Sequence, residues 1–116
     1  MHKKLAIIEN TYLGIEDHGI LTSWLTVKYE EGGNQGVGLY SFDHRDKDSK
    51  KIIGHPAASI WLRNVLEVAG VDEWNKLPGK MIYVLTEEDE WNSKVLGIAA
   101  LALRADKAFM FDEMSD

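Results

Sequence analysis

Residues 20–29 alternate between two kinds of side chain, and this alternation constrains the fold more than any other feature of the sequence. One set comprises Leu21, Ser23, Leu25, Val27 and Tyr29, and the other comprises Thr22, Trp24, Thr26 and Lys28. A period of two residues is typical of a strand with one face in the core and one face toward solvent. We therefore predict a half-buried strand over residues 20–29, with a tryptophan on its outer face.

A glycine-rich stretch, EEGGNQG at residues 30–36, follows this strand. Glycine adopts positive φ angles at little cost, so the stretch predicts a hairpin loop, with residues 37–42 as the returning strand. Pairing about the middle of the loop places Trp24 opposite Phe42 and Thr26 opposite Tyr40. We expect Trp24, Tyr40 and Phe42 to share one face, either as part of the core or as an exposed aromatic platform.

The clearest helix is predicted over residues 56–69, where apolar side chains recur every three or four residues between Pro56 and Gly70. Further strands are predicted over residues 4–15 and 80–86, and the charged residues 43–51 are predicted to form a loop. Residues 94–103 are compatible with either helix or strand, and Val95, Ile98 and the preceding turn favour a strand.

The element order is therefore β-β-β-α-β-β in one domain spanning residues 1–116, with residues 106–116 as a flexible acidic tail. Two hairpins that flank one helix differ from the alternating pattern of parallel sheets. We predict an α+β fold, mostly β, built as a small five-stranded antiparallel barrel or bent sheet that resembles an OB fold.

The composition excludes several classes of protein. The chain has no cysteine, which rules out disulfides, thiolate catalysis and cysteine-based zinc sites. Its apolar runs are shorter than a membrane helix requires, and we expect a cytoplasmic protein without membrane contact. The net charge of −6 argues against a protein that coats duplex DNA.

We find no sequence motif for catalysis, for a cofactor or for a metal. The histidines lack metal-ligand spacing, the glycines lack the lysine of a phosphate loop, and there is no Gly-x-Ser-x-Gly elbow. The pairs Asp17-His18 and Asp43-His44 leave a small-ligand or metal-dependent enzyme as a third-ranked alternative. We predict a binding protein without catalytic residues or cofactor.

Two binding hypotheses follow. In the first, aromatic residues stack on unpaired bases of a single-stranded nucleic acid while basic residues hold its phosphates. The candidates are Trp24, Lys28, Tyr40, Phe42, Arg45, Lys47, Lys50 and Lys51. An exposed aromatic hairpin face is equally suited to a homodimer contact.

In the second hypothesis, an acidic surface binds a basic surface on a host or phage protein, as DNA would. The C-terminal half of the chain carries most of the excess negative charge. The candidate partner-binding residues are Glu87, Glu88, Asp89, Glu90, Phe109 and Phe111.

Two stretches, residues 10–43 and 61–84, carry a resemblance to a known group. Residues 10–22 read Asn-Thr-x-Leu-Gly-x-Glu-Asp-His-Gly-Ile-Leu-Thr, and residues 69–79 read Ala-Gly-Val-x-x-Trp-x-x-Leu-Pro-Gly. They resemble a family of small proteins encoded by tailed phages and prophages, to which no activity is attached. The resemblance implies a phage origin, expression in bacterial cytoplasm, and a role in phage replication, recombination or counter-defence. The end of the chain, residues 105–116, departs from the family pattern.

Overall fold

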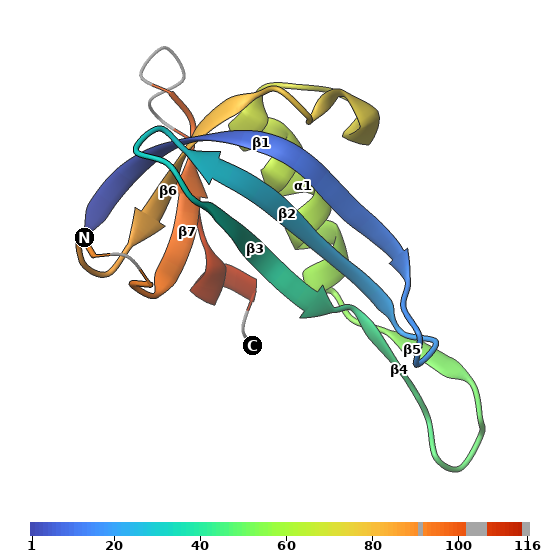
Figure 1. Cartoon of the computed structure of the whole chain (residues 1–116). Coiled ribbons are helices and arrows are strands. Elements are labelled where there is room, and N and C mark those ends of the chain that lie inside the picture. Colours follow the sequence, from blue (N-terminus) through green and yellow to red (C-terminus); the bar gives the residue numbers. More distant parts are fainter. Residues whose placement is uncertain (91, 102–106, 115–116) are drawn as a thin grey trace.

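The computed structural model describes residues 1–90, 92–101 and 107–114, with the backbone alone for Leu39 and Tyr40. In this described part, six strands form one antiparallel sheet in the order β3-β2-β1-β6-β7-β8 (Figure 1). These strands are β1 (His2–Ile15), β2 (Leu21–Tyr29), β3 (Asn34–Ser41), β6 (Met81–Thr86), β7 (Val95–Ala99) and β8 (Ala108–Met110). The long strand β1 joins the two halves of the sheet, because it pairs with β2 on one side and with β6 on the other.

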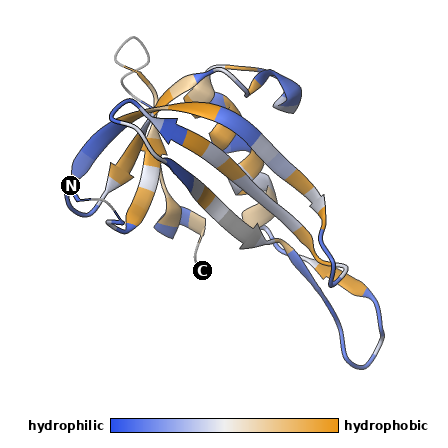
Figure 2. Ribbon diagram, viewed as in Figure 1, coloured by the Kyte–Doolittle hydropathy of each residue, from blue (hydrophilic) through white to orange (hydrophobic). Residues whose placement is uncertain are grey.

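A second, two-stranded sheet extends from the ends of β2 and β3. It consists of β4 (Asp43–Arg45) and β5 (Ile52–Gly54), and we call residues 43–54 the finger. The finger projects beyond the main sheet, and its tip is hydrophilic (Figures 1 and 2). The predicted loop at residues 43–51 is thus part of a hairpin, whose second strand the sequence analysis missed.

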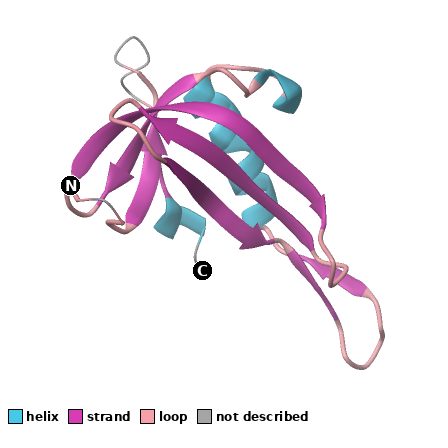
Figure 3. Ribbon diagram, in the orientation of Figure 1, coloured by secondary structure: helices cyan, strands magenta, loops and turns pink. Residues whose placement is uncertain are grey.

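The helix α1 (Ala57–Ala69) confirms the predicted helix over residues 56–69. Gly70 ends it in the left-handed conformation, with φ of 74°, and its N–H group bonds back to the carbonyls of Leu66 and Glu67. The helix lies behind the ribbon of β1, β2 and β3 in the view of Figure 3. Short 3-10 helices follow at η1 (Trp74–Lys76) and η3 (Phe111–Met114).

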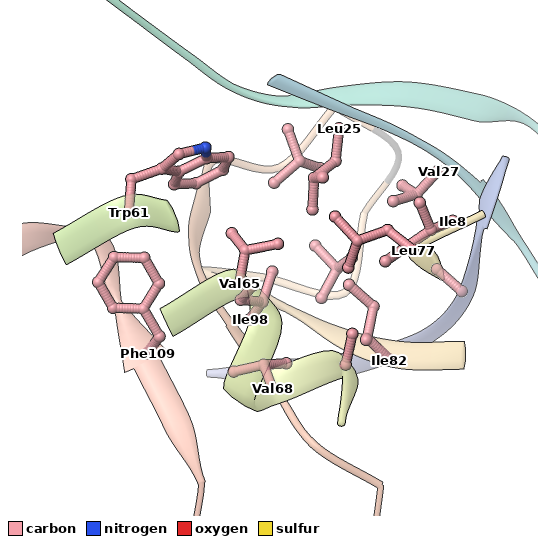
Figure 4. Packing of buried hydrophobic residues seen from close by; sticks show 14 of the residues in the cluster. Ile8, Leu25, Val27, Trp61, Val65, Val68, Leu77, Ile82, Ile98 and Phe109 are labelled. Carbon is pink, nitrogen blue, oxygen red and sulfur yellow. The ribbon is translucent and has the colours of Figure 1, made fainter. Parts of the chain in front are cut away.

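The hydrophobic core lies between α1 and the sheet (Figure 4). Trp61, Val65 and Val68 of the helix are almost completely buried, against Leu25 and Val27 of β2. Burial of each large apolar side chain stabilises the fold by about 1.5–3 kcal/mol. The spacing of apolar residues in the sequence therefore identified the buried sides of both α1 and β2.

The structure confirms an α+β fold, mostly β, with one main helix among the described residues. Of the two predicted forms, a five-stranded barrel or a bent sheet, the closed barrel does not form, because β3 and β8 lie at opposite edges of the described six-stranded sheet and do not pair with each other. The strand chosen over residues 94–103 is confirmed as β7, and residues 102–103 lie outside the described part. None of the described helices is long and apolar enough to cross a membrane.

The predicted flexible tail is the second main difference. Within residues 107–114, β8 pairs with β7 and η3 follows it directly. Phe109 is fully buried, and its ring lies 6.2 Å from that of Trp61. The apolar side chains of this segment complete the core, so residues 107–114 belong to the fold.

Candidate functional site

The ribbon of β1, β2 and β3 has two different faces. Leu25 and Val27 point toward α1 and are fully buried, whereas Lys28 between the two core positions Val27 and Tyr29 is exposed. We call the face opposite α1 the open face, since none of the described helices is drawn over it (Figure 3). Trp24 lies on the open face and is half-buried, as the alternation predicted.

Trp24 has an aromatic partner on the neighbouring strand. Tyr12 of β1 is its direct cross-strand neighbour, and the two rings stack with centroids 4.2 Å apart and planes 10° from parallel. Aromatic pairs across strands stabilise a sheet and hold both rings in a fixed orientation. Tyr12 is also half-buried, so the pair presents part of its aromatic surface to solvent.

Local contacts fix the ring of Tyr12. Its hydroxyl donates a hydrogen bond to the carbonyl of Ile15 at 3.2 Å, which lays the ring along the strand. A Cβ atom at Gly14 would lie 3.2 Å from that hydroxyl oxygen, so glycine leaves the space that the ring occupies. The chain at residues 12–15 therefore shapes one half of the aromatic pair.

A buried chain of hydrogen bonds ties the pair to the core. The indole N–H of Trp61 donates to Ser23 Oγ at 3.0 Å, and Ser23 Oγ donates to the carbonyl of Tyr12 at 2.8 Å. Ser23 is completely buried, so its bond to the Trp61 indole is shielded from water, whereas its bond to Tyr12 is partly buried. The position of Tyr12 thus depends on the helix that lies behind the sheet.

Phe42 does not share the open face, which corrects the prediction. The pairing of β2 with β3 shifts between Ser23 and Trp24, because Ser23 lies opposite Tyr40 and Trp24 lies opposite Gly38. The extra residue in β3 reverses which face the following side chains take. Phe42 is consequently buried, at 1% exposure, within the core.

The remaining candidates for nucleic-acid binding are placed as follows. The side chain of Tyr40 lies outside the described part of the structure, and its proposed role stays a prediction. Lys28 is exposed on the open face. The basic residues of the finger are all exposed, namely Arg45, Lys47, Lys50 and Lys51.

Hydrogen bonds order the finger loop. The Arg45 guanidinium donates to the carbonyl of Lys50 at 2.7 Å, and the carboxylate of Asp46 accepts the N–H of Ser49 at 2.8 Å. The bonds from Ser49 hold the pKa of Asp46 below its ordinary value, and nearby His44 adds a smaller effect in the same direction. The lysines of the loop therefore project from a structured turn.

The finger begins close to the aromatic pair. The carboxylate of Asp43 accepts the backbone N–H of Leu21 at 3.0 Å, which fixes the finger to the first residue of β2. Trp24 lies three residues further along this strand, a distance of about 10 Å. The finger that carries the basic loop thus projects from the end of the ribbon at which the aromatic pair lies.

The candidates for the acidic partner-binding surface are separated by the fold. Glu87, Glu88, Asp89 and Glu90 are all exposed in the turn between β6 and β7. Phe109 is buried in the core, and the ring of Phe111 is half-buried 5.7 Å from that of Trp61. Phe109 is therefore a core residue, whereas Phe111 packs against the core with part of its ring exposed, and its role in binding stays a prediction.

Two pairs of described residues involve histidines. His18 Nδ1 lies 3.1 Å from a carboxylate oxygen of Glu16, and this hydrogen bond is the main reason why the pKa of Glu16 is lowered. His44 contacts His55 at the base of the finger, a partner that the sequence analysis did not consider. Among the described residues, no cluster of three or more potential metal ligands occurs.

Tyr12 is the residue of the aromatic pair that sequence reasoning missed. The alternation of side chains along β1 could have identified it, but a register shift between Ile8 and Asn10 interrupts that alternation. Comparisons with models of protein families and with curated proteins found no match to this chain. The geometry of the open face therefore carries the functional argument.

Proposed function

We propose that this chain is a non-enzymatic binding protein that engages single-stranded nucleic acid through the open face and the finger. The observation that carries the proposal is the half-exposed stack of Tyr12 and Trp24 at the end of the ribbon from which the exposed basic finger projects. Stacking on aromatic rings contributes about 1–3 kcal/mol per base and requires no particular base sequence. The lysines of the finger supply the charge that attracts phosphates.

The proposal differs from the sequence hypothesis in its aromatic residues. Tyr12 takes the place of Phe42, which packs in the core. Nor does the proposal require the closed OB-like barrel, because a sheet face with aromatic and basic residues is sufficient for stacking. Bases would lie against the exposed parts of Tyr12 and Trp24, and the backbone would run toward the finger.

The distribution of charge supports binding of nucleic acid at the finger, although the protein as a whole is acidic. Residues 43–51 contain four basic and three acidic side chains, whereas residues 87–90 are all acidic. The acidic turn lies in the β6–β7 hairpin, on the other side of β1 from the finger. We expect modest affinity with a strong dependence on salt.

The resemblance to small phage and prophage proteins gives this activity a setting. A protein of that origin would act in the bacterial cytoplasm during phage replication or recombination. Single-stranded nucleic acid is the common intermediate of both processes, so a sequence-tolerant stacking surface suits either role.

The test is a titration of a fluorescently labelled oligo-dT, followed by anisotropy at low and moderate salt. We expect Trp24→Ala to weaken binding about 5- to 150-fold, as loss of one stacked base predicts. Tyr83→Ala is the matched control, since Tyr83 is a half-buried tyrosine on β6, away from the finger. Equal affinity of the wild-type protein and Trp24→Ala would refute the proposal.

A second function is favoured by one observation. Four consecutive acidic side chains, residues 87–90, are exposed on a turn that Ser93 Oγ orders by accepting the N–H of Glu88 at 2.7 Å. Such a surface suits a basic patch on a host protein. A host protein captured by the wild-type chain but not by a variant with these four residues changed to amides would support it.

A further inference from the structure

Two histidines from different segments meet at the base of the finger. His44 lies in β4, and His55 directly follows β5. His44 Nδ1 and His55 Nε2 are 3.2 Å apart, and the ring centroids are 5.0 Å apart with planes 26° from parallel. Both residues are exposed, so an ion in solution can reach them.

These two distances agree with ligation of one metal ion. Two ring nitrogens that each lie about 2.05 Å from an ion are 3.2 Å apart when the angle at the ion is about 103°. The centre of an imidazole lies about 1.15 Å behind a ring nitrogen, so this arrangement separates the two centres by about 5.0 Å. A straight N–H···N hydrogen bond of the same length would separate them by about 5.5 Å.

The backbone holds both histidines in place without an ion. The N–H of His55 donates to the carbonyl of Phe42 at 2.8 Å, and the carbonyl of His55 accepts the N–H of Ala58 at the start of α1 at 3.0 Å. His44 follows Asp43, whose carboxylate is bonded to the backbone of β2. The backbone at both histidines is therefore already ordered, which lowers the entropic cost of binding an ion.

We propose that His44 and His55 form a two-histidine site for a divalent transition-metal ion, with water in the remaining coordination positions. Neutral imidazole is a preferred ligand of Zn²⁺, Ni²⁺ and Cu²⁺, whereas Mg²⁺ and Ca²⁺ prefer oxygen ligands. With two protein ligands, the site is suited to reversible binding.

The site would connect the finger to the segment that leads into α1. An ion held by His44 and His55 links β4 to the segment between β5 and α1, and so fixes the finger against the helix. It also adds positive charge at the base of the basic loop. The proposal is independent of nucleic-acid binding, because it rests on the two imidazoles alone.

The experiment measures binding of Zn²⁺ to the full-length protein by isothermal titration calorimetry at pH 7.5, with no affinity tag. We expect one ion per chain, and at least tenfold weaker binding in His44→Gln and in His55→Gln. His18→Gln and His2→Gln are matched controls that retain binding, since neither residue is part of the pair. Circular dichroism confirms that each variant is folded, which the exposure of both histidines makes the expected result.

A second readout distinguishes this site from adventitious binding at other side chains. Zn²⁺ should shift the imidazole resonances of His44 and His55 in a two-dimensional NMR spectrum before those of His18, and removal of the ion with a chelator should reverse the shift. No saturable binding, or unchanged binding in the His44→Gln/His55→Gln double variant, would overturn the proposal and leave the pair as a contact between two imidazoles.

Discussion

The protein has two groups of aromatic residues on opposite faces of the same sheet, and they differ in how they are covered. Trp61, Phe109 and Phe111 form the inner cluster, with ring centroids 5.5 to 6.2 Å apart between α1, β8 and η3. Tyr12 and Trp24 form the outer pair, stacked at 4.2 Å on the open face. The inner rings pack at steep angles to one another, with Trp61 and Phe109 fully buried, whereas the outer rings lie nearly parallel and both are only half-buried.

This difference shows how one strand supplies both structure and a candidate binding surface. Ser23 and Trp24 are consecutive residues in β2, yet Ser23 binds the indole of Trp61 inside and Trp24 stacks with Tyr12 outside. Because successive side chains of a strand point to opposite faces, a substitution of Ser23 changes the inner contacts and a substitution of Trp24 changes the outer contacts. We therefore expect stability to depend on the inner cluster and binding to depend on the outer pair.

The largest expected effect is that of Phe109→Ala. This substitution removes a fully buried ring that contacts both other members of the inner cluster. Loss of a buried phenylalanine typically lowers the free energy of unfolding by about 3–5 kcal/mol. Urea unfolding followed by circular dichroism measures the change.

Trp24→Ala is the matched comparison on the outer face. Its ring is only half-buried, so we expect a loss of about 1 kcal/mol, mostly from the aromatic pair. If Trp24→Ala were as destabilising as Phe109→Ala, the outer pair would be a structural element and the division between the two groups would be wrong.

Gly38→Ala tests the space that the inner cluster needs. Gly38 has a φ of 102°, and a Cβ atom there would lie 2.6 Å from Cη2 of Trp61. The strained backbone and the displaced indole together should lower the free energy of unfolding by about 2–4 kcal/mol. Gly36→Ala on the same strand is the control, since a Cβ at Gly36 meets nothing within 4 Å.

Ser23→Ala tests the connection between the two groups. The buried indole N–H of Trp61 would lose its hydrogen bond to Ser23 Oγ, which should lower the free energy of unfolding by about 1–3 kcal/mol. The near-ultraviolet circular dichroism of the protein should also change, because the carbonyl of Tyr12 loses its hydrogen bond. Ser59→Ala removes an exposed serine on α1 and should have almost no effect. An unchanged stability in Ser23→Ala would show that the two groups are independent.

The smallest expected effect is a pH dependence of the stability of the protein. Glu67 accepts a hydrogen bond from Lys107 at 2.8 Å, and this contact, with a lesser contribution from Arg63, holds the pKa of Glu67 below its ordinary value. The stability gained from this pair is present above the ordinary glutamate pKa and is lost as the pH falls through the lowered value. Glu67→Gln should thus be slightly less stable than wild type at pH 7 and equal to it near pH 2.

Exposure of the side chains keeps this effect small, because solvent screens ion pairs at the surface. Glu31→Gln, at an exposed position in the β2–β3 turn, serves as the control. A stability difference between wild type and Glu67→Gln that stayed constant from pH 7 to pH 2 would contradict the assignment.

The periodic parts of the fold were predictable from the sequence. Alternation in residues 20–29 identified Leu25, Val27 and Tyr29 as core residues of β2, although Thr22, which it placed on the outer face, is also buried. The apolar spacing before Gly70 identified α1. These patterns are local, since they follow from the geometry of a single strand or helix. The face on which Trp24 lies was predictable for the same reason, but its half-burial beside Tyr12 was not.

The errors arose where a structure depends on pairing between segments. Phe42 was assigned to the wrong face because one extra residue in β3 is invisible to the alternation of β2. The strand β5 is short and follows a charged loop, and His55 approaches His44 only through the hairpin. Whether the sheet is open or closes into a barrel depends on whether its two edge strands pair. That follows from the pairing of all six described strands and not from the pattern within any one of them.

The pairing of β1 has a consequence for the order in which the protein folds during synthesis. β1 and β2 are close in the chain and can pair soon after they leave the ribosome, but His2 pairs with Thr86 of β6. The second edge of β1 therefore stays unpaired until most of the chain has been translated. Closure of that long loop should be the slow step of folding, and the nascent β1–β2–β3 ribbon is the form that a chaperone would meet first.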